Sequence, residues 1–200
     1  TVLMSTRSKK NLQREKTSSS TQNKQSRPGK KAKSSLETGS FRIIGGQWRS
    51  RRLSFPAIEG LRPTTDRVRE TVFNWLNAEI QGAHVLDVFS GSGALGLEAL
   101  SRGATSLLAI EKDKQAAKAL QANTDILVSG SQDIKSVTIQ HTDALVFLAD
   151  LKVQANNEDI SKKDLFDLVF LDPPFRKGIL EDTLVLLDQH PSIQKGALIY

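Results

Sequence analysis

Four carboxylates of this sequence fall at or just beyond the ends of four short apolar runs. They are Asp87, Glu111, Asp143 and Asp172, and the runs cover residues 84–89, 106–110, 136–140 and 166–171. Stretches with helical periodicity separate the runs, which is typical of parallel strands covered by helices on both faces. Because ligands of such sheets bind at the carboxyl edge, we expect the four side chains to line one site.

The first run leads into a glycine-rich turn. Gly91, Gly93 and Gly96 satisfy the spacing Gly-x-Gly-x-x-Gly, which by itself is a weak signal. In dinucleotide-binding folds glycine follows the strand directly, so that a pyrophosphate can bind at the helix N-terminus. Here Asp87 closes the strand, and its charge would repel a pyrophosphate. A carboxylate suits a ligand that carries an ammonium group and no phosphate, such as S-adenosylmethionine.

The next two carboxylates could bind an adenosine. Glu111 follows Gly91 by 20 residues, a position from which an acidic side chain can bind both ribose hydroxyls. NAD and S-adenosylmethionine share this requirement, so Glu111 does not distinguish between them. Asp143 could accept the adenine amino group, or it could be a plain N-cap of the helix that begins at Ala144.

The fourth run ends in Asp172-Pro173-Pro174-Phe175. Proline has no backbone N–H, so this turn presents acceptors from Asp172 and the Pro173 carbonyl. Acceptors suit an exocyclic amine, which is a poor nucleophile because its lone pair is delocalised into the ring. Phe175 could stack on a base flipped into the site. We therefore predict catalysis at these four residues; the alternative is a turn that only ends the strand.

Charge divides the chain of 200 residues into a basic arm and an acidic body. The formal charge is +8 over residues 1–40, +3 over 41–81 and −5 over 82–200. Residues 1–40 are rich in Ser, Thr, Lys, Gln and Asn without aliphatic periodicity, so we expect a disordered tail that meets a polyanion. An organelle transit peptide has a similar composition, but these residues form no amphipathic helical face.

Residues 41–63 are predicted to form a β-hairpin and a linker. Two strand-like runs, 41–44 and 47–53, flank Gly45-Gly46, a pair that suits a two-residue turn. Arginines interleave with aromatic residues here, so we predict RNA contact. The predicted RNA-binding residues are Arg42, Trp48, Arg49, Arg51, Arg52 and Arg67. The alternative is that Trp48 caps the core and the arginines are solvated.

A helix is expected to start near residue 65 or 66. The residues of its predicted buried face, which recur at helical spacing, are Val68, Val72, Trp75 and Leu76. Arg67 and Arg69 lie in its first turn, where positive charge opposes the helix dipole. These two arginines indicate either an anionic partner or exposed side chains without a role.

Composition excludes several classes of protein. The sequence has no cysteine, and His84, His141 and His190 lack metal-ligand spacing, so we expect no disulfide, thiolate nucleophile or metal site. The chain has no run of roughly 18 to 20 apolar residues and no apolar region of a secretory signal. We therefore expect no membrane span, and we expect a cytoplasmic monomer.

From residue 41 onward the chain resembles the RsmD family of bacterial 16S rRNA guanine-N2 methyltransferases, which are class I enzymes that depend on S-adenosylmethionine. The resemblance rests on residues 42–49, 61–70, 91–102 and 172–175. The second and third of these runs are far more specific than the last, which adenine-N6 methyltransferases share.

The resemblance implies a class I Rossmann-like fold, a doubly wound and mostly parallel α/β sheet, over residues 64–200. The implied cofactor contacts are Asp87, Phe89, Gly91, Gly93, Glu111, Asp143 and Ala144. The sequence ends inside an expected fifth strand over residues 197–200, so we expect the final strands of this fold to be missing. The long tail also lies outside the family core.

Together, these features predict transfer of a methyl group from S-adenosylmethionine to the N2 amine of a guanine in 16S rRNA, either free or within a small ribosomal subunit. Adenine-N6 methylation of DNA or RNA stays open, because both amines donate protons to the same acceptors. A nicotinamide-dependent oxidoreductase would leave the Asp-Pro-Pro-Phe turn unexplained. A non-catalytic RNA-binding assembly factor would not need the glycines and carboxylates.

Overall fold

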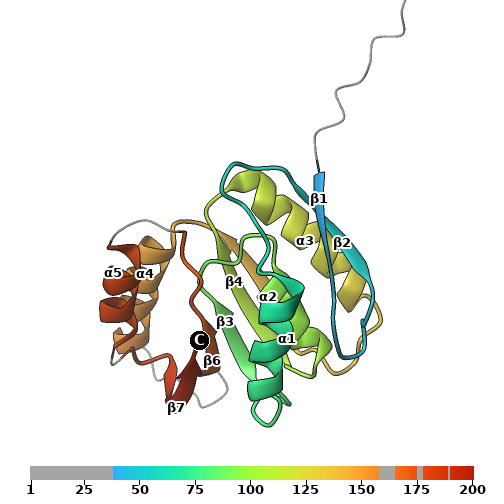
Figure 1. Cartoon of the computed structure of the whole chain (residues 1–200). Helices are drawn as coiled ribbons and strands as arrows, with labels where there is room; N and C mark the ends of the chain where they lie inside the picture. The colour runs from blue at the N-terminus through green and yellow to red at the C-terminus, as the bar shows by residue number, and fades with distance from the viewer. Residues whose placement is uncertain (1–37, 158–164, 175–177, 189) are drawn as a thin grey trace, which may run out of the picture. The chain divides into compact units, whose positions relative to one another are not determined.

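The computed structural model describes residues 38–157, 165–174, 178–188 and 190–200 (Figure 1). Residues 1–37 of the predicted disordered tail lie outside the described residues. The strands are β1 (Thr38–Arg42), β2 (Arg52–Pro56), β3 (His84–Asp87), β4 (Ser106–Glu111), β5 (Ser136–His141), β6 (Phe166–Phe170) and β7 (Ile193–Ile199). The helices are α1 (Asp66–Trp75), α2 (Ala94–Ser101), α3 (Lys114–Val128), α4 (Ala144–Asn157) and α5 (Ile179–Leu187).

Five strands form a parallel sheet in the order β5-β4-β3-β6-β7. The chain winds outward from β3 to β5 and then returns to the other side of β3 with β6 and β7. A helix lies in each connection, so the predicted doubly wound fold is confirmed. The winding direction changes between β3 and β6, and open α/β sheets bind ligands at the carboxyl ends of the strands beside such a point.

The central strand β3 separates two hydrophobic clusters. Val85 and Leu86 are adjacent and are both fully buried, because successive side chains of a strand point to opposite faces. Val85 packs in one cluster with residues of α1, α2 and α3, including Phe73 and Leu97. Leu86 packs in the other with residues of α4 and α5, including Leu148. Figure 1 shows α4 and α5 side by side, away from α1 and α2.

The N-terminal strands β1 and β2 pair antiparallel, as predicted, but the predicted two-residue turn at Gly45-Gly46 is wrong. Arg42 pairs with Arg52, so residues 43–51 form the connection, and β1 begins at Thr38, inside the predicted tail. The connection docks on the end of α2, where a Cβ on Gly46 would lie 1.7 Å from the Ser101 carbonyl oxygen. The glycine pair therefore permits close contact with a helix.

The hairpin strands also pack on the body formed by the parallel sheet and its helices. Figure 1 shows β2 beside α3, and the Asn123 side chain of α3 donates a hydrogen bond of 2.9 Å to the Ser54 carbonyl. Phe41, Leu53 and Phe55 are buried in the same cluster as Val85. The hairpin therefore belongs to the core of residues 38–200.

The buried face of α1 differs from the predicted one. Val72 and Leu76 are buried as expected, but Val68 is 42% exposed and Trp75 is 72% exposed. Arg69 is fully buried instead. Apolar periodicity misplaced the face because a buried arginine occupies a position that the pattern treats as polar.

The last strand, β7, begins four residues before the predicted run. The predicted run, residues 197–200, was too short because Gln194, Lys195 and Gly196 interrupt the hydrophobic pattern of the strand. The pairing of β7 with β6 also shifts register. In the part of the chain that the structure describes, no helix has the length and apolar character needed to cross a membrane.

Candidate active site

Strand register brings the predicted carboxylates to one edge of the sheet. Asp87 at the end of β3 pairs with Ala109 of β4 and with Phe170 of β6. Glu111 and Asp172 each lie two residues beyond those partners. They therefore flank Asp87 on its two sides at the carboxyl edge. Asp143 follows β5 in the same manner, since Glu111 pairs with His141.

Asp87 lies at the centre of this edge and is only 2% exposed. Its Oδ2 accepts a hydrogen bond of 3.2 Å from the Gly96 N–H in α2. Burial raises the pKa of Asp87 to about 7, and the nearby charges of Asp172 and Glu111 act in the same direction. Both effects disfavour its ionised form, so a positively charged ligand beside it would restore the charge.

The glycine turn between β3 and α2 has the conformation that its spacing suggests. Gly91 and Gly93 have φ angles of +52° and +81°, and Gly93 is the N-cap of α2. A Cβ on Gly93 would lie 2.2 Å from Leu120 of α3, and one on Gly96 would lie 2.9 Å from Leu107 of β4. Glycine therefore allows α2 to begin tightly against the sheet, with the helix N-terminus at the carboxylate edge.

Glu111 ties the end of β4 to the glycine turn. Its Oε2 accepts a hydrogen bond of 2.7 Å from the Gly91 N–H, and its Oε1 accepts one of 2.6 Å from the Asp113 N–H. A carboxylate offers about four acceptor positions, so each oxygen keeps capacity for a ligand hydroxyl. The contact of Glu111 with a ribose stays a prediction, and the backbone contacts hold its carboxylate in place.

Asp143 caps the start of α4, which was one of the two roles predicted for it. Its Oδ1 accepts a hydrogen bond of 3.0 Å from the Leu145 N–H at the start of α4, and its Oδ2 pairs with Lys112 Nζ at 2.8 Å. The hydrogen bond from Lys112 lowers the pKa of Asp143. The adenine contact stays a prediction, as do those of Phe89, which packs against the second cluster, and Ala144, which is buried.

The predicted catalytic turn follows β6, and its Asp172 is exposed. The Thr64 hydroxyl donates a hydrogen bond of 2.9 Å to Asp172 Oδ2. Pro173 is half-buried and Pro174 is exposed, whereas Phe175 lies outside the described residues. Sequence reasoning missed Thr64, because no local pattern relates it to an aspartate 108 residues away.

The predicted RNA-binding residues divide into exposed and buried side chains. Arg49, Arg51, Arg52 and Arg67 are exposed. Trp48 is 5% exposed and packs in the core, which corrects the prediction that its ring meets RNA. Its backbone N–H bonds the Ser101 hydroxyl at 3.0 Å, so the loop that carries it is fixed to α2.

A sixth predicted RNA-binding residue, Arg42, forms an ion pair. Its Nε lies 2.8 Å from Asp66 Oδ2 at the start of α1. The side chains of Arg42 and Asp66 are 56% and 46% exposed, so this pair is open to solvent and to competing anions. Exposed pairs of this kind contribute little stability.

A buried ion network also went unrecognised in the sequence. Arg69 and Glu98 are both fully buried, and Arg69 Nη1 lies 3.3 Å from Glu98 Oε2. Glu98 also accepts hydrogen bonds from the Ile44 and Gly45 N–H groups at 2.8 Å each and from Arg102 Nε at 2.7 Å. The anionic partners of Arg69 are therefore within the chain, Glu98 and, at 2.8 Å, Asp66, and the interpretation of Arg69 as an exposed side chain without a role is wrong.

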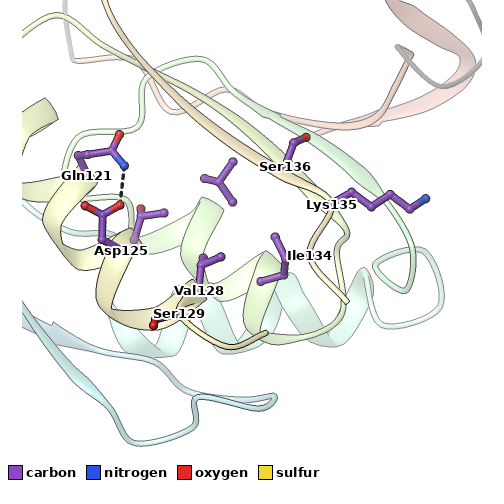
Figure 2. A pocket seen from close by; sticks show the side chains of 9 residues that line it. Gln121, Asp125, Val128, Ser129, Ile134, Lys135 and Ser136 are labelled. Carbon is purple, nitrogen blue, oxygen red and sulfur yellow. Dashed lines mark hydrogen bonds between the residues drawn. The ribbon is translucent and has the colours of Figure 1, made fainter. Parts of the chain in front are cut away.

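A hollow of about 360 Å³ lies away from these carboxylates, between the end of α3 and the start of β5 (Figure 2). Its lining includes Gln121, Asp125, Val128, Ile134 and Lys135. Figure 2 shows Gln121 and Asp125 joined by a hydrogen bond along α3. The hollow is at the amino-terminal edge of the sheet, opposite the edge where the glycine turn and carboxylates meet.

The parallel order of the sheet, the glycine turn after its central strand and the acidic residues at its carboxyl edge define the class I methyltransferase fold. The family model described as "Conserved hypothetical protein 95" matches residues 41–200. The chain belongs to this family, which is that of ribosomal RNA small subunit methyltransferase D.

Individual relatives agree with this assignment. Ribosomal RNA small subunit methyltransferase D of Escherichia coli K12 is 46% identical over 163 residues, covering 82% of this chain and 74% of the relative. Its Haemophilus influenzae counterpart is 40% identical over 171 residues, covering 86% and 82%. A solved structure of a proposed methyltransferase, yhhF of Escherichia coli, is 42% identical with a TM-score of 0.65, covering 80% of this chain and 79% of that one. The chain is accordingly a methyltransferase.

Proposed function

We propose that this methyltransferase moves a methyl group from S-adenosylmethionine to the exocyclic N2 amine of a guanine in 16S rRNA. The observation that carries the proposal is the grouping of Asp87, Glu111 and Asp172 at one edge beside a glycine turn. The family relatives carry the name of a small-subunit rRNA methyltransferase, which favours this RNA as substrate.

The residues of the edge fit S-adenosylmethionine better than a phosphate-bearing cofactor. Three neighbouring carboxylates disfavour a pyrophosphate, while the buried Asp87 with its raised pKa favours a ligand carrying an ammonium group. Asp87 and the Gly91–Gly93 turn would hold the methionine part, Glu111 the ribose hydroxyls, and Asp143 the adenine amine. The cofactor supplies an electrophilic methyl group on a sulfonium.

Asp172 would act on the substrate amine. Its exposed carboxylate and the Pro173 carbonyl would accept hydrogen bonds from the N2 amine, which would localise the nitrogen lone pair toward the methyl group. With S-adenosylmethionine bound, methyl transfer would break its S–C bond as the C–N bond forms, and Asp172 would pass the one proton that the amine loses to solvent. Positioning and acceptor hydrogen bonds carry the reaction, with no covalent enzyme intermediate.

The exposed arginines would hold the RNA. Arg49, Arg51 and Arg52 lie on the connection and start of β2, and Arg67 lies on α1. They are suited to phosphates, while an unpaired guanine enters the site, as single-stranded RNA targets generally do. The basic residues 1–37, outside the described residues, would add non-specific attraction. This substrate puts the activity in the cytoplasm, and the proposal requires only one copy of the chain.

Analysis of the labelled nucleoside tests the proposal. The full chain is incubated with methyl-labelled S-adenosylmethionine and small ribosomal subunits from cells that lack the enzyme, and the digested RNA is separated by chromatography. We expect N2-methylguanosine at one site. Subunits from cells that contain the enzyme are the control and should accept no label. Label in N6-methyladenosine, or no label in either particle, would overturn the proposed substrate.

A further inference from the structure

The extended segment of residues 61–65 borders both halves of the site. A Cβ placed on Gly91 would lie 3.0 Å from Leu61 Cδ1, so Leu61 contacts the glycine turn. Three residues later the Thr64 hydroxyl donates its hydrogen bond to Asp172 Oδ2. One short segment therefore touches the loop that would hold the cofactor and the turn that would receive the substrate.

Thr64 is fixed from the protein interior. Its carbonyl accepts a hydrogen bond of 3.1 Å from Arg69 Nε, and Arg69 is fully buried. The same guanidinium donates to the Arg42 carbonyl at 2.8 Å and pairs with Glu98. The next residue, Thr65, is the N-cap of α1. The backbone of Thr64 is thus held on one side by the ion network and on the other by a helix.

The Asp172 carboxylate needs such a support. It is exposed at the end of β6 and is followed by prolines, whose missing N–H groups cannot orient it from the turn itself. An exposed aspartate samples several rotamers, but only some of them direct an oxygen at an incoming amine. The hydroxyl of Thr64 binds one oxygen and leaves the acceptor capacity of the other for the substrate.

We propose that Thr64 is a positioning residue, whose hydroxyl holds the Asp172 carboxylate in the orientation that receives the protons of the substrate amine. This inference rests on the proposed function, because it assigns Asp172 to that step. It also gives the Arg69–Glu98 network a role in catalysis, since the network holds the backbone of Thr64.

Two substitutions of Thr64 distinguish the effect of its hydroxyl on kcat from the effect of its side-chain shape. Thr64→Val removes the hydroxyl and keeps the branched shape, and we expect the kcat for methylation of ribosomal subunits to fall about tenfold, the effect of one orienting hydrogen bond. Thr64→Ser keeps the hydroxyl and should restore most of that rate. The KM values for cofactor and subunits should change less than twofold, because Thr64 touches neither in this role.

The control is Thr71→Val. The Thr71 hydroxyl is also exposed and donates to the Arg67 carbonyl in α1 at 3.0 Å, so this variant makes the same chemical change on the neighbouring helix without touching Asp172. Its kcat should equal that of the unaltered protein.

A double-mutant cycle gives the sharpest result. If Thr64 acts through Asp172, adding Thr64→Val to Asp172→Ala should cause no further loss of kcat. A full tenfold loss in that background, an unchanged kcat in Thr64→Val alone, or no rescue by Thr64→Ser would each overturn the inference. Failure of the unaltered protein to form N2-methylguanosine would overturn the proposed function instead, so the two failures are distinguishable.

Discussion

The two sides of the carboxylate edge are built differently. On the side of β4 and β5, Glu111 accepts hydrogen bonds from the Gly91 and Asp113 N–H groups, and Asp143 accepts one from the Leu145 N–H and pairs with Lys112. On the side of β6, Asp172 is exposed and is bonded by the hydroxyl of Thr64, from a segment outside the sheet. Segments at the carboxyl edge of the sheet, mainly through backbone N–H groups, therefore hold Glu111 and Asp143, whereas a side chain from outside the sheet holds Asp172.

This difference matches the sizes of the two proposed ligands. A small cofactor can be enclosed by loops at the strand ends, and rigid backbone contacts keep those loops in shape. A guanine that remains attached to rRNA needs an open approach, so its acceptor has to be exposed. The proposed substrate side would then depend for its rigidity on the hairpin, α1 and the buried Arg69–Glu98 pair, which contacts the Thr64 carbonyl.

The largest effect is expected for Glu98→Ala, which tests whether the substrate side depends on the buried network. The substitution leaves the buried Arg69 without its buried counter-charge, with only the half-exposed Asp66 remaining, and removes the acceptor of two loop N–H groups. Breaking one partner of a buried pair typically lowers the free energy of unfolding by about 3–5 kcal/mol. Urea unfolding measures this change.

Glu70→Ala on the exposed face of α1 is the control, with an expected change within about 0.5 kcal/mol. If Glu98→Ala were as stable as this control, the network would not hold the hairpin and residues 61–65 in place.

The second-largest effect is expected for Asp172→Ala, which tests whether one side of the edge acts on the substrate and the other binds the cofactor. We expect kcat to fall about 10²–10³-fold, as for the loss of one preorganised electrostatic contact. Cofactor affinity should be almost unchanged, because the proposed function assigns Asp172 to the substrate. Single-turnover methylation and calorimetry measure the two quantities.

Asp182→Ala removes an exposed carboxylate from α5 and serves as the matched control. Parallel losses of cofactor affinity and kcat in Asp172→Ala would mean that Asp172 belongs to the cofactor side.

The third effect concerns Glu111→Ala and tests the cofactor side. Each hydrogen bond from a ligand hydroxyl to a charged acceptor contributes roughly 1.5–3 kcal/mol, so the loss of even one of the two ribose bonds should raise the Kd for S-adenosylmethionine at least about tenfold. Part of the loss reflects the Gly91 N–H, which Glu111 also binds. Calorimetry on the folded variant makes the measurement, and an unchanged Kd would remove Glu111 from the pocket.

The smallest effect is a pH dependence at Asp87, which lies between the two sides. Its pKa is raised to about 7 in the folded protein, so the folded state binds more protons than the unfolded state between pH 4 and 7. Its contribution to stability is therefore greatest at low pH and is lost as pH rises through 7. The linkage of proton binding to folding predicts that this group lowers the free energy of unfolding by roughly 1 kcal/mol between pH 6 and pH 8.

Asp87→Asn should flatten that part of the stability curve. Urea unfolding of cofactor-free protein at several pH values compares the two slopes. Equal slopes would show that Asp87 does not carry a raised pKa. Bound S-adenosylmethionine should also reduce the slope in the unaltered protein, because its ammonium favours the charged form of Asp87.

The sequence by itself determined the elements whose signals are local. Apolar runs and glycine spacing located β3, the turn at Gly91 and Gly93 and the start of α2, and each is confirmed. The alignment of Asp87, Glu111 and Asp172 at one edge followed from parallel pairing, since strands of one sheet share a direction. These predictions succeeded because each strand and turn is signalled by residues near one another in the chain, and the common direction of parallel strands then brings their ends to one edge.

Tertiary structure alone decided the features that join distant segments. In the sequence Arg69 has the position of an exposed first-turn arginine. In the structure Glu98 of α2, 29 residues away, provides a buried counter-charge for it. The sequence predicted that Trp48 stacks on RNA bases. In the structure the loop that carries Trp48 is bonded to Ser101, and the indole ring is buried. No sequence pattern marked Thr64 as a site residue, and only the structure shows its hydrogen bond to Asp172. A polar side chain is stable in the interior only when the fold brings it a partner, and the partner's position is a property of packing rather than of local sequence.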